Sequence, residues 1–362
     1  MKILLLGGGG FIGCHITQKL LQSTDHLVNC YDLFDARLQD SLGHSRFNYI
    51  HGDIRHDHTR VEKLIHDADV VVDLIAYANP SLYVSIPLDV FNLNFTENLK
   101  ITEYCVTHQK RLIQFSTCEV YGKTVASLLQ NQLPDHDNPA HAVFQEDNTA
   151  FILGPVNKHR WIYSCAKQLL ERIIHAYGLE DRLNYTIIRP FNFIGPRIDF
   201  LPSEQEGNPR VFSHFLDALK TGEPMKLING GHQRRTYTYI DDAVDCIVRI
   251  VENPNQVCDK EIFNIGSPDN EISIRDLAFK MRCIYKRRWW RGQTELPEPI
   301  EVSGETFYGE GYDDSDRRIP DITKAQQLLG WQPRYNLDQT LEYSMGYWFN
   351  GEEGTSWIPQ FT

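Results

Sequence analysis

The sequence predicts an α/β fold: a Rossmann-type doubly wound parallel sheet that carries a smaller α/β lobe. In the first half of the chain, short apolar runs typical of buried strands alternate with segments of helical periodicity. The first apolar run leads directly into a glycine-rich turn and a helix. The second half contains similar segments but loses the regular alternation, which favours an irregular lobe.

Composition limits the possible partners. The chain has 362 residues and a formal net charge of −12, which argues against nucleic acid or an anionic membrane as the main partner. The apolar run after Met1 ends at Gly7, too early for a secretion signal, and no run is long enough for a transmembrane helix. Eight scattered cysteines without a C-x-x-C pair are typical of reduced thiols. We therefore expect a cytoplasmic protein.

The first strand and turn predict a nucleotide site. The strand Lys2–Leu6 is followed by four consecutive glycines and a helix that extends to about Leu21. Glycines let the backbone approach a pyrophosphate, which then lies at the helix N-terminus. Two motif registers are open, G-x-G-x-x-G from Gly8 or G-x-x-G-x-x-G from Gly7. The candidate cofactor residues of this turn are Gly7, Gly10, Phe11, Ile12 and Gly13.

A second strand, Leu27–Tyr31, ends in Asp32, at the spacing expected of the acid that bonds the adenosine ribose. A carboxylate there repels a 2′-phosphate, so the sequence favours NAD over NADP as the cofactor. Arg37 lies nearby and leaves NADP open. In Gly52-Asp53-Ile54, Asp53 could meet the adenine amino group, and we include Ile54 in the predicted cofactor site.

Further strands at 47–50, 70–76 and 112–115 and a helix at 88–106 continue the alternation. His56-Asp57-His58 has the composition of a metal site, but no third ligand is suggested, so we predict a surface turn and no metal. Residues 124–157 are polar, contain proline and show little periodicity. We interpret them as an insertion that forms a loop over the site.

Tyr163 and Lys167 are the candidate catalytic pair. They stand four residues apart in a segment of helical periodicity, Trp161–Tyr177, and so project from one face. A free phenol titrates near pH ~10, and an ammonium one turn away is expected to lower its pKa. Thr117, at the end of a predicted strand, offers a hydroxyl to the same substrate oxygen. Such a group suits removal of a proton from an alcohol whose carbon gives hydride to a nicotinamide.

After the strand 185–188 the regular rhythm loosens. We predict short strands at 226–228, 236–239 and 262–265 and helices at 211–219, 242–251, 274–285 and 337–349. The basic-aromatic run 286–291 is interpreted as a helix end. We expect residues 1–190 to form an NAD-binding Rossmann domain and residues 351–362 a tail. Residues 191–350 should form mainly a substrate-binding lobe, with segments that return to the first domain.

Several motifs together resemble the extended short-chain dehydrogenases/reductases of the nucleotide-sugar branch. They are Gly7-x-x-Gly10-x-x-Gly13, Tyr163-x-x-x-Lys167 and Arg189-Pro190-x-Asn192 with Gly195-Pro196. The resemblance selects the register from Gly7. Longer runs, Gly154 to Lys167 and Tyr308 to Tyr312 with Arg318 and Pro320, resemble UDP-glucuronate decarboxylases. Those runs, together with Phe115 to Lys123, are at least as similar to plant UDP-apiose/UDP-xylose synthases.

The resemblance implies NAD-dependent oxidative decarboxylation of UDP-glucuronate. Tyr163, assisted by Lys167 and Thr117, would take the proton from the sugar O4 as hydride leaves C4. The resulting 4-keto sugar loses CO₂ to give UDP-4-keto-pentose and/or UDP-xylose. The resemblance assigns Glu119 to acid–base work on the ring side and Arg318 to the substrate carboxylate or protonation at C5.

The resemblance also implies a substrate site and an assembly. The implied substrate-binding residues are Tyr83, Arg160, Asn192, Arg210, Lys226, Arg235 and Tyr312. Arginine forks suit phosphate oxygens, and an aromatic ring can cover uracil. Related enzymes pair two helices into an intermolecular four-helix bundle, and the matching helices here are 88–106 and 161–177. We therefore expect a homodimer.

Three alternative functions remain open at this point. One is a nucleotide-sugar 4-epimerase or 4,6-dehydratase, against which the match around Arg318 argues. Another is an NAD-binding regulator without turnover, which predicts loss of Tyr163 or Lys167, yet both are present. The third is a UDP-apiose/UDP-xylose synthase, which carries two active-site cysteines. One of them matches Cys118 but the other falls on Ala78, so we expect little branched-chain sugar.

Overall fold

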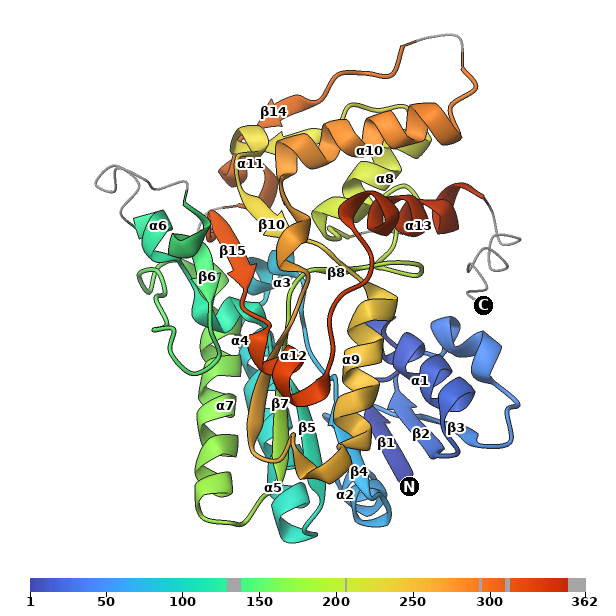
Figure 1. Cartoon of the computed structure of the whole chain (residues 1–362), viewed down its shortest axis with the longest axis vertical. Helices are drawn as coiled ribbons and strands as arrows, with labels where there is room; N and C mark the ends of the chain where they lie inside the picture. Colours follow the sequence, from blue (N-terminus) through green and yellow to red (C-terminus); the bar gives the residue numbers. More distant parts are fainter. Residues whose placement is uncertain (129–137, 206, 293–294, 310–312, 351–362) are drawn as a thin grey trace.

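The computed structural model describes residues 1–128, 138–205, 207–292, 295–309 and 313–350. Its largest element is a sheet of seven strands in the order β12-β7-β5-β4-β1-β2-β3, in which every neighbouring pair is parallel. The strands are β1 Lys2–Leu6, β2 Leu27–Asp32, β3 Phe47–His51, β4 Val70–Asp73, β5 Arg111–Phe115, β7 Tyr185–Pro190 and β12 Glu261–Ile265. This confirms the predicted Rossmann-type sheet (Figure 1).

Helices cover both faces of this sheet because its strands are apolar on both sides. In β1, Ile3 and Leu5 pack into one core and Leu4 and Leu6 into the other. The first face is covered by α1 Phe11–Ser23 and α9 Ile240–Glu252, and the second by α2 His58–Asp67, α5 Asn98–Thr107 and α7 Ile162–Leu179. Successive side chains of a strand point to opposite faces of the sheet. Because both faces are buried here, the strands appear in the sequence as continuous apolar runs.

A second lobe lies beyond the carboxyl ends of the large sheet (Figure 1). Its four-stranded sheet has the order β13-β10-β15-β6, and two strand pairs, β11-β8 and β14-β9, accompany it. These strands are β6 Val143–Phe144, β8 Phe193–Ile194, β9 Lys226–Ile228, β10 Arg234–Thr236, β11 Thr238–Tyr239, β13 Glu271–Ser273, β14 Ile300–Val302 and β15 Arg317–Pro320. The lobe helices are α8 Val211–Thr221, α10 Ile274–Arg288, α11 Gly304–Tyr308 and α13 Leu337–Phe349, whereas α12 Thr323–Leu329 packs against β12 of the large sheet and against α9.

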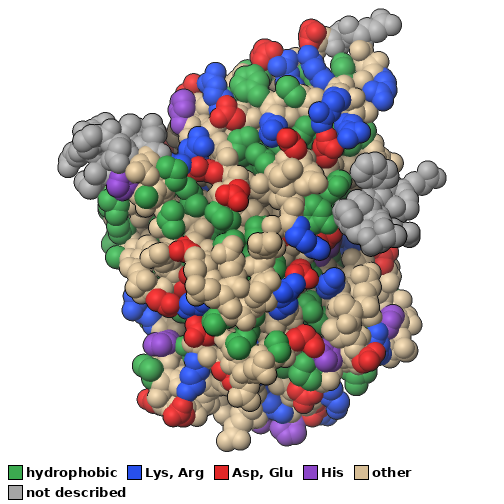
Figure 2. All heavy atoms as spheres, in the orientation of Figure 1, with side chains coloured by type: hydrophobic (Ala, Val, Ile, Leu, Met, Phe, Trp, Pro, Cys, Tyr) green, Lys and Arg blue, Asp and Glu red, His purple; other side chains and the backbone are tan. Residues whose placement is uncertain are grey.

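The domain boundary near residue 190 stays a prediction, but β12 shows how the second half returns to the large sheet. β12 pairs with β7 at the edge of that sheet, and α9 packs beside α1. The basic run after residue 285 ends α10, as expected. Acidic and basic side chains are interspersed over the face shown in Figure 2. Within the described part of the chain, none of the helices combines the length and the apolar composition needed to cross a bilayer.

The insertion at 124–157 differs from the prediction. Its described part contains α6 Val125–Leu128 and the strand β6, which pairs in parallel with β15 of the second lobe. Phe144 of β6 stacks on Tyr121 at a ring-centroid distance of 4.5 Å. No described residue of the insertion lines the main cavity, so the expected loop over the site is not observed in that part. Aromatic packing that a periodicity search does not detect holds the segment in place.

The helix predicted at 88–106 is interrupted by a π-helical turn. The chain forms α3 Pro80–Ser85 and α4 Pro87–Phe91, then the turn Asn92–Glu97, and then α5. Such a turn leaves backbone carbonyls for side-chain donors. Asn98 Nδ2 donates to the carbonyl oxygens of Leu93 at 2.9 Å and Ile75 at 3.3 Å. This arrangement fixes the Asn98 side chain at the active-site end of the helix.

Candidate active site

A cavity of about 280 Å³ lies between the carboxyl ends of the central strands and the second lobe. The first half of the chain contributes Leu74, Thr117 and Tyr163 to its wall, among others, and the second half contributes Arg210 and Arg318. The order of the large sheet reverses at β1 and β4, beside this cavity. Ligands of doubly wound sheets bind at such a switch point.

The glycine turn has the shape of a pyrophosphate cradle. Gly7 has φ +77°, and a Cβ on Gly13 would lie 2.5 Å from Gly8, so both positions need glycine. A Cβ on Gly10 would instead meet nothing closer than 3.6 Å and would project into space that a ligand could fill. α1 starts at Phe11 with no side-chain cap and no acidic residue in its first turn. Its N-terminus is therefore suited to an anion.

Asp32 lies where a ribose-binding acid is expected. Its carboxylate accepts hydrogen bonds from the backbone N–H groups of Gly9 at 2.8 Å and Phe34 at 3.0 Å, which holds it against the glycine turn. Arg37, which left NADP open, is directed elsewhere: Nε donates to the Arg197 carbonyl at 2.9 Å and Nη2 to the Asp199 carbonyl at 2.6 Å. The donor set around the predicted ribose site therefore favours NAD.

The other predicted cofactor residues have different placements. Asp53 is held by the Arg55 guanidinium, with a shortest distance of 2.6 Å, and 21% of its side chain stays exposed. Its contact with adenine stays a prediction. Ile54 is buried in the core, so only its backbone can reach a ligand. Ile12 lines the cavity, whereas the Phe11 ring is buried in the core beside it.

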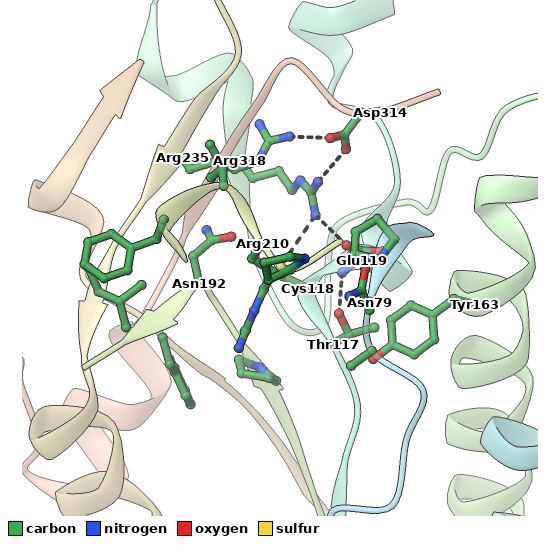
Figure 3. Close-up of a pocket in the computed structure, with 18 of the residues that line it drawn as sticks. Asn79, Thr117, Cys118, Glu119, Tyr163, Asn192, Arg210, Arg235, Asp314 and Arg318 are labelled. Atoms are coloured by element: carbon green, nitrogen blue, oxygen red, sulfur yellow. Dashed lines mark hydrogen bonds and ion pairs between the residues drawn. The ribbon is translucent and has the colours of Figure 1, made fainter. Parts of the chain in front are cut away.

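Tyr163 is the second residue of α7 and only 4% exposed. Its hydroxyl points toward the Thr117 side chain (Figure 3), whose hydroxyl favours the ionised phenol. The Thr117 oxygen also accepts the Glu119 backbone N–H at 3.2 Å, which fixes that hydroxyl above the end of β5. The Tyr163 ring stacks on Tyr83 of α3 at 4.6 Å. The two predicted hydroxyls are therefore brought together, as the sequence led us to expect.

The expected effect of Lys167 on the Tyr163 phenol is not observed. Burial raises the pKa of Tyr163, Glu119 raises it further, and the Thr117 hydrogen bond opposes both effects. Lys167 Nζ donates instead to Asn98 Oδ1 at 3.2 Å and to the Phe115 carbonyl at 3.0 Å. Burial lowers the pKa of Lys167 to about 8. The helical spacing predicted a common face correctly, but the desolvation of both groups outweighs their proximity.

The partners of Lys167 form a buried network that we did not predict. Gln114 Nε2 donates to Asp73 Oδ2 at 3.0 Å and to Asn98 Oδ1 at 3.3 Å. Burial raises the pKa of Asp73 to about 6, and the positive charge of Lys167 opposes that shift. The sequence offered one sign of this network: Asp73 is a carboxylate at the end of the apolar strand β4, which reads Val-Val-Val-Asp.

The predicted acid–base pair lies in a buried charged cluster. Glu119 accepts two hydrogen bonds from Arg160, at 2.5 and 2.8 Å, and lies 3.8 Å from Arg318. Burial favours the neutral acid, but the neighbouring Arg160 guanidinium outweighs it and keeps the pKa of Glu119 below its usual value. Arg318 also lies 3.7 Å from the sulfur of Cys118, whose pKa is raised by burial.

Asp314 is the member of this cluster that the sequence analysis missed. Its carboxylate oxygens accept hydrogen bonds from Arg318 at 2.6 Å and Arg235 at 2.8 Å (Figure 3). Arg160 donates a third, at 3.4 Å. Burial opposes ionisation, but the three guanidiniums hold the pKa of Asp314 well below its usual range. Its place between other acidic residues in the sequence resembled a solvated run. Three guanidiniums and two carboxylates leave one net positive charge on this cavity wall.

Two of the remaining predicted substrate residues reach the cavity and one does not. Asn192 lines it, with a left-handed backbone (φ +42°) and Nδ2 bonded to the Thr236 carbonyl at 2.9 Å. Arg210 also lines it. Lys226 is exposed at the start of β9, where Ile228 of the same strand lines the cavity, so its contact with substrate stays a prediction. Tyr312 lies outside the described residues.

Known proteins with similar sequences and structures identify the family. The profile of the "NAD dependent epimerase/dehydratase family" matches residues 3–266. The chain belongs to this family. It is 43% identical over 358 residues to UDP-D-apiose/UDP-D-xylose synthase 1 of Arabidopsis thaliana, covering 96% of this chain and 91% of that protein.

Among solved structures, the PbgP3 protein from Burkholderia pseudomallei is 36% identical, with a TM-score of 0.80 and 96% of each chain covered. The UDP-glucuronic acid 4-epimerase from Bacillus cereus, in complex with UDP-glucuronic acid and NAD, is 24% identical. It has a TM-score of 0.77 and covers 96% of this chain and 98% of its own. This second likeness shows the fold.

As a member of this family the chain uses NAD as its cofactor. The residues present fit that group. The open space beside Gly10 and the uncapped start of α1 would take the pyrophosphate, and Asp32 would hold the adenosine ribose. Ile12, Leu74 and Pro190 would enclose the reactive end, since they line the cavity on the side of the central strands.

Proposed function

We propose that this protein catalyses NAD-dependent oxidative decarboxylation of UDP-glucuronate, through a 4-keto intermediate, to UDP-4-keto-pentose and/or UDP-xylose. The observation that carries the proposal is one cavity that holds both the Tyr163–Thr117 pair and a net positive arginine cluster. The first suits oxidation of a sugar hydroxyl, and the second suits a sugar carboxylate. The identity to a protein named UDP-apiose/UDP-xylose synthase supports the same substrate class.

When bound, NAD⁺ would supply the hydride acceptor for C4 and a positive charge that favours an ionised Tyr163. The Tyr163 oxygen then accepts the O4 proton, while the Thr117 hydroxyl orients O4. Burial of the phenol, and its stacking on Tyr83, keeps water from competing for that proton. Lys167 holds Asn98 and the end of β5, and so keeps the oxidation site in register.

Oxidation at C4 makes the C5 carboxylate a β-keto acid, whose loss of CO₂ leaves an enolate delocalised into the new carbonyl. Arg318 is suited to hold that carboxylate. Its Nη2 donates to Asp314 at 2.6 Å, whereas its Nη1 lies 3.8 Å from Glu119 and can turn to a substrate. Glu119 is ionised and fixed by Arg160, so it acts as a hydrogen-bond acceptor for a sugar hydroxyl. The buried Cys118 thiol lies beside Arg318 and can donate the proton that C5 takes up.

The test is an incubation of the purified protein with UDP-glucuronate and NAD⁺, with the sugar product identified by NMR and CO₂ measured. We expect a UDP-pentose or its 4-keto form with one CO₂ per substrate. UDP-glucose is the matched control, since it lacks the carboxylate and should give no CO₂. UDP-galacturonate without CO₂ would establish a 4-epimerase and overturn the proposal.

A second candidate is the branched sugar UDP-apiose, which the name of the 43% identical relative favours. Against it stands Ala78, which lines the cavity at the position matched to a second cysteine of such synthases. A methyl group offers neither acid–base chemistry nor a thiol to a ring-opened aldehyde. We therefore propose straight-chain pentose as the main product, and UDP-apiose as a major NMR species would contradict this.

We also propose that the protein is a cytoplasmic homodimer paired through α4–α5 and α7. Three leucines on these helices are exposed: Leu88 (74%), Leu169 (44%) and Leu179 (73%). Pairing with a second copy through these helices would bury their side chains. All eight cysteines are free, which supports a reducing compartment. Sedimentation equilibrium should give twice the monomer mass, and Leu169→Glu should shift it toward monomer.

A further inference from the structure

Two segments about 160 residues apart in the sequence bind each other beside the cofactor turn. The first is the 3₁₀ turn Ala36–Ser41, which follows Asp32, and the second is the loop 196–199 of the second half. Arg37 donates to the carbonyls of Arg197 and Asp199, at 2.9 and 2.6 Å. In return Arg197 donates to the Arg37 carbonyl at 3.0 Å and to Asp40 at 2.6 Å.

The loop to which Arg37 is hydrogen-bonded has a backbone conformation that would be unfavourable without those contacts. Arg197 and Asp199 have φ values of +64° and +43°, a region that non-glycine residues rarely adopt. Such conformations persist only where the surroundings hold them. The Arg37 hydrogen bonds go to the carbonyls of these two residues, and His15 of α1 bonds the Pro196 carbonyl at 2.9 Å. Contacts from the cofactor half therefore fix the loop.

The same loop orients a substrate-binding residue. The Asp199 carboxylate accepts hydrogen bonds from Arg210 Nε at 2.9 Å, Arg210 Nη2 at 2.6 Å and the Arg210 backbone N–H at 3.0 Å. Arg210 precedes α8, lines the cavity, and has its guanidinium carbon 5.9 Å from the Phe11 ring centroid at the start of α1. A continuous series of contacts thus runs from Arg37 through Asp199 to Arg210.

We propose that Arg37 is a positioning residue for the nucleotide sugar: it holds the 197–199 backbone so that Asp199 presents Arg210 to the cavity. The inference rests on the proposed function, because it takes a uridine diphosphate as the group that Arg210 meets. Asp32, the predicted ribose acid, ends β2 a few residues before the turn that carries Arg37, so binding of NAD and of the UDP-sugar should favour each other. Such coupling is reciprocal, and its usual size is about 5- to 150-fold in affinity.

The test is calorimetric titration with UDP, an unreactive probe, into protein with and without saturating NAD⁺. Arg37→Ala should weaken UDP binding by on the order of tenfold in the presence of NAD⁺ and reduce the gain that NAD⁺ gives. In turnover, KM for UDP-glucuronate should rise by a similar factor while kcat changes less. Arg37→Lys keeps the charge but lacks the fork that meets two carbonyls, and should fall between wild type and Arg37→Ala.

Arg46→Ala is the matched control. Arg46 also donates to backbone carbonyls, including Leu21 at 2.6 Å, but all of them lie within the cofactor half. Its removal should leave UDP affinity within about twofold of wild type. Asp199→Asn, which keeps the Arg37 contacts and weakens only the pair with Arg210, should reproduce the UDP effect. It also tests the proposal if Arg37→Ala does not fold.

A double-mutant cycle separates positioning from a general structural role. In an Arg210→Ala background, Arg37→Ala should have little further effect on UDP affinity. An equal effect in both backgrounds, or normal UDP binding by Arg37→Ala, would overturn the inference while leaving the proposed function intact. Failure of the wild-type protein to bind UDP even with NAD⁺ would overturn the proposed function and this inference with it.

Discussion

The glycine turn and the arginine cluster are both built for anions, and they achieve this by opposite means. In the turn, side chains are excluded: Gly10 faces open space, and N–H groups at the start of α1 supply the positive potential. In the cluster, side chains from distant segments supply the charge, with Arg160, Arg235 and Arg318 gathered around Asp314. The backbone site depends on local conformation, whereas the side-chain site depends on how distant parts of the chain meet.

Tyr163 lies between these two sites, and its removal should leave both intact. Tyr163→Phe deletes only the hydroxyl, so NAD and UDP should bind normally while sugar oxidation falls by about 10²- to 10⁴-fold. Formation of the 4-keto product, followed by NMR, checks this. A rate within about tenfold of wild type would show that another group accepts the O4 proton.

Arg318→Ala probes the side-chain site. Release of CO₂ should fall by roughly 10²-fold, because the substrate carboxylate loses its guanidinium, whereas UDP affinity should change only a few-fold. Arg318→Lys should recover part of the rate, since it restores charge without the fork. Normal CO₂ release combined with poor UDP binding would transfer Arg318 to the nucleotide-binding residues.

Two alanine substitutions distinguish the parts of the backbone site. A Cβ on Gly13 would lie 2.5 Å from Gly8, so Gly13→Ala should lower the melting temperature and abolish NAD binding together. A Cβ on Gly10 meets no protein atom closer than 3.6 Å, so Gly10→Ala should keep the melting temperature within about 2 °C. It should nevertheless weaken NAD binding by about tenfold or more, as measured by calorimetry, because the methyl group occupies ligand space. Unchanged NAD affinity in Gly10→Ala would place the pyrophosphate elsewhere.

The buried network around Lys167 and the arginine cluster also differ in how they treat a buried carboxylate. The folded-state pKa of Asp73, about 6, lies above its ordinary value of 3.8, so the folded protein binds the proton more tightly. Its contribution to stability is complete below about pH 4 and is lost as the pH rises through about 6. The difference in urea midpoint between wild type and Asp73→Asn should therefore decrease from pH 4 to pH 6.5.

Asp314 supplies the contrast, because its pKa is shifted the other way. Its contribution is present above the ordinary carboxyl pKa, so the stability difference between wild type and Asp314→Asn should stay flat from pH 5 to pH 8. Parallel pH profiles for the two variants would contradict the opposite shifts of these buried acids. This difference in the pH dependence of stability is the smallest of the effects that we predict.

The sequence by itself predicted the backbone site and the Tyr163–Lys167 pair. Strand, glycine turn, helix and Asp32 fall within one βαβ unit, where steric limits on a few neighbouring residues decide the conformation. Tyr163 and Lys167 are likewise neighbours on one helix. The place of Thr117 at the end of a strand pointed to its hydroxyl, and the resemblance to known dehydrogenases pointed to Glu119 and Arg318. All three line the cavity.

Only the tertiary structure decided the electrostatics. Asp314 gathers arginines from positions 79 and 154 residues away, and Arg37 meets a loop 160 residues away. No local pattern encodes such meetings, because they arise when separate elements pack around one sheet. Burial raises the pKa of Tyr163 and lowers that of Lys167, whereas their spacing alone predicted a lowered pKa for Tyr163. The reason is that desolvation depends on everything that surrounds a group. The same packing left Lys226 outside the cavity although its strand lines it.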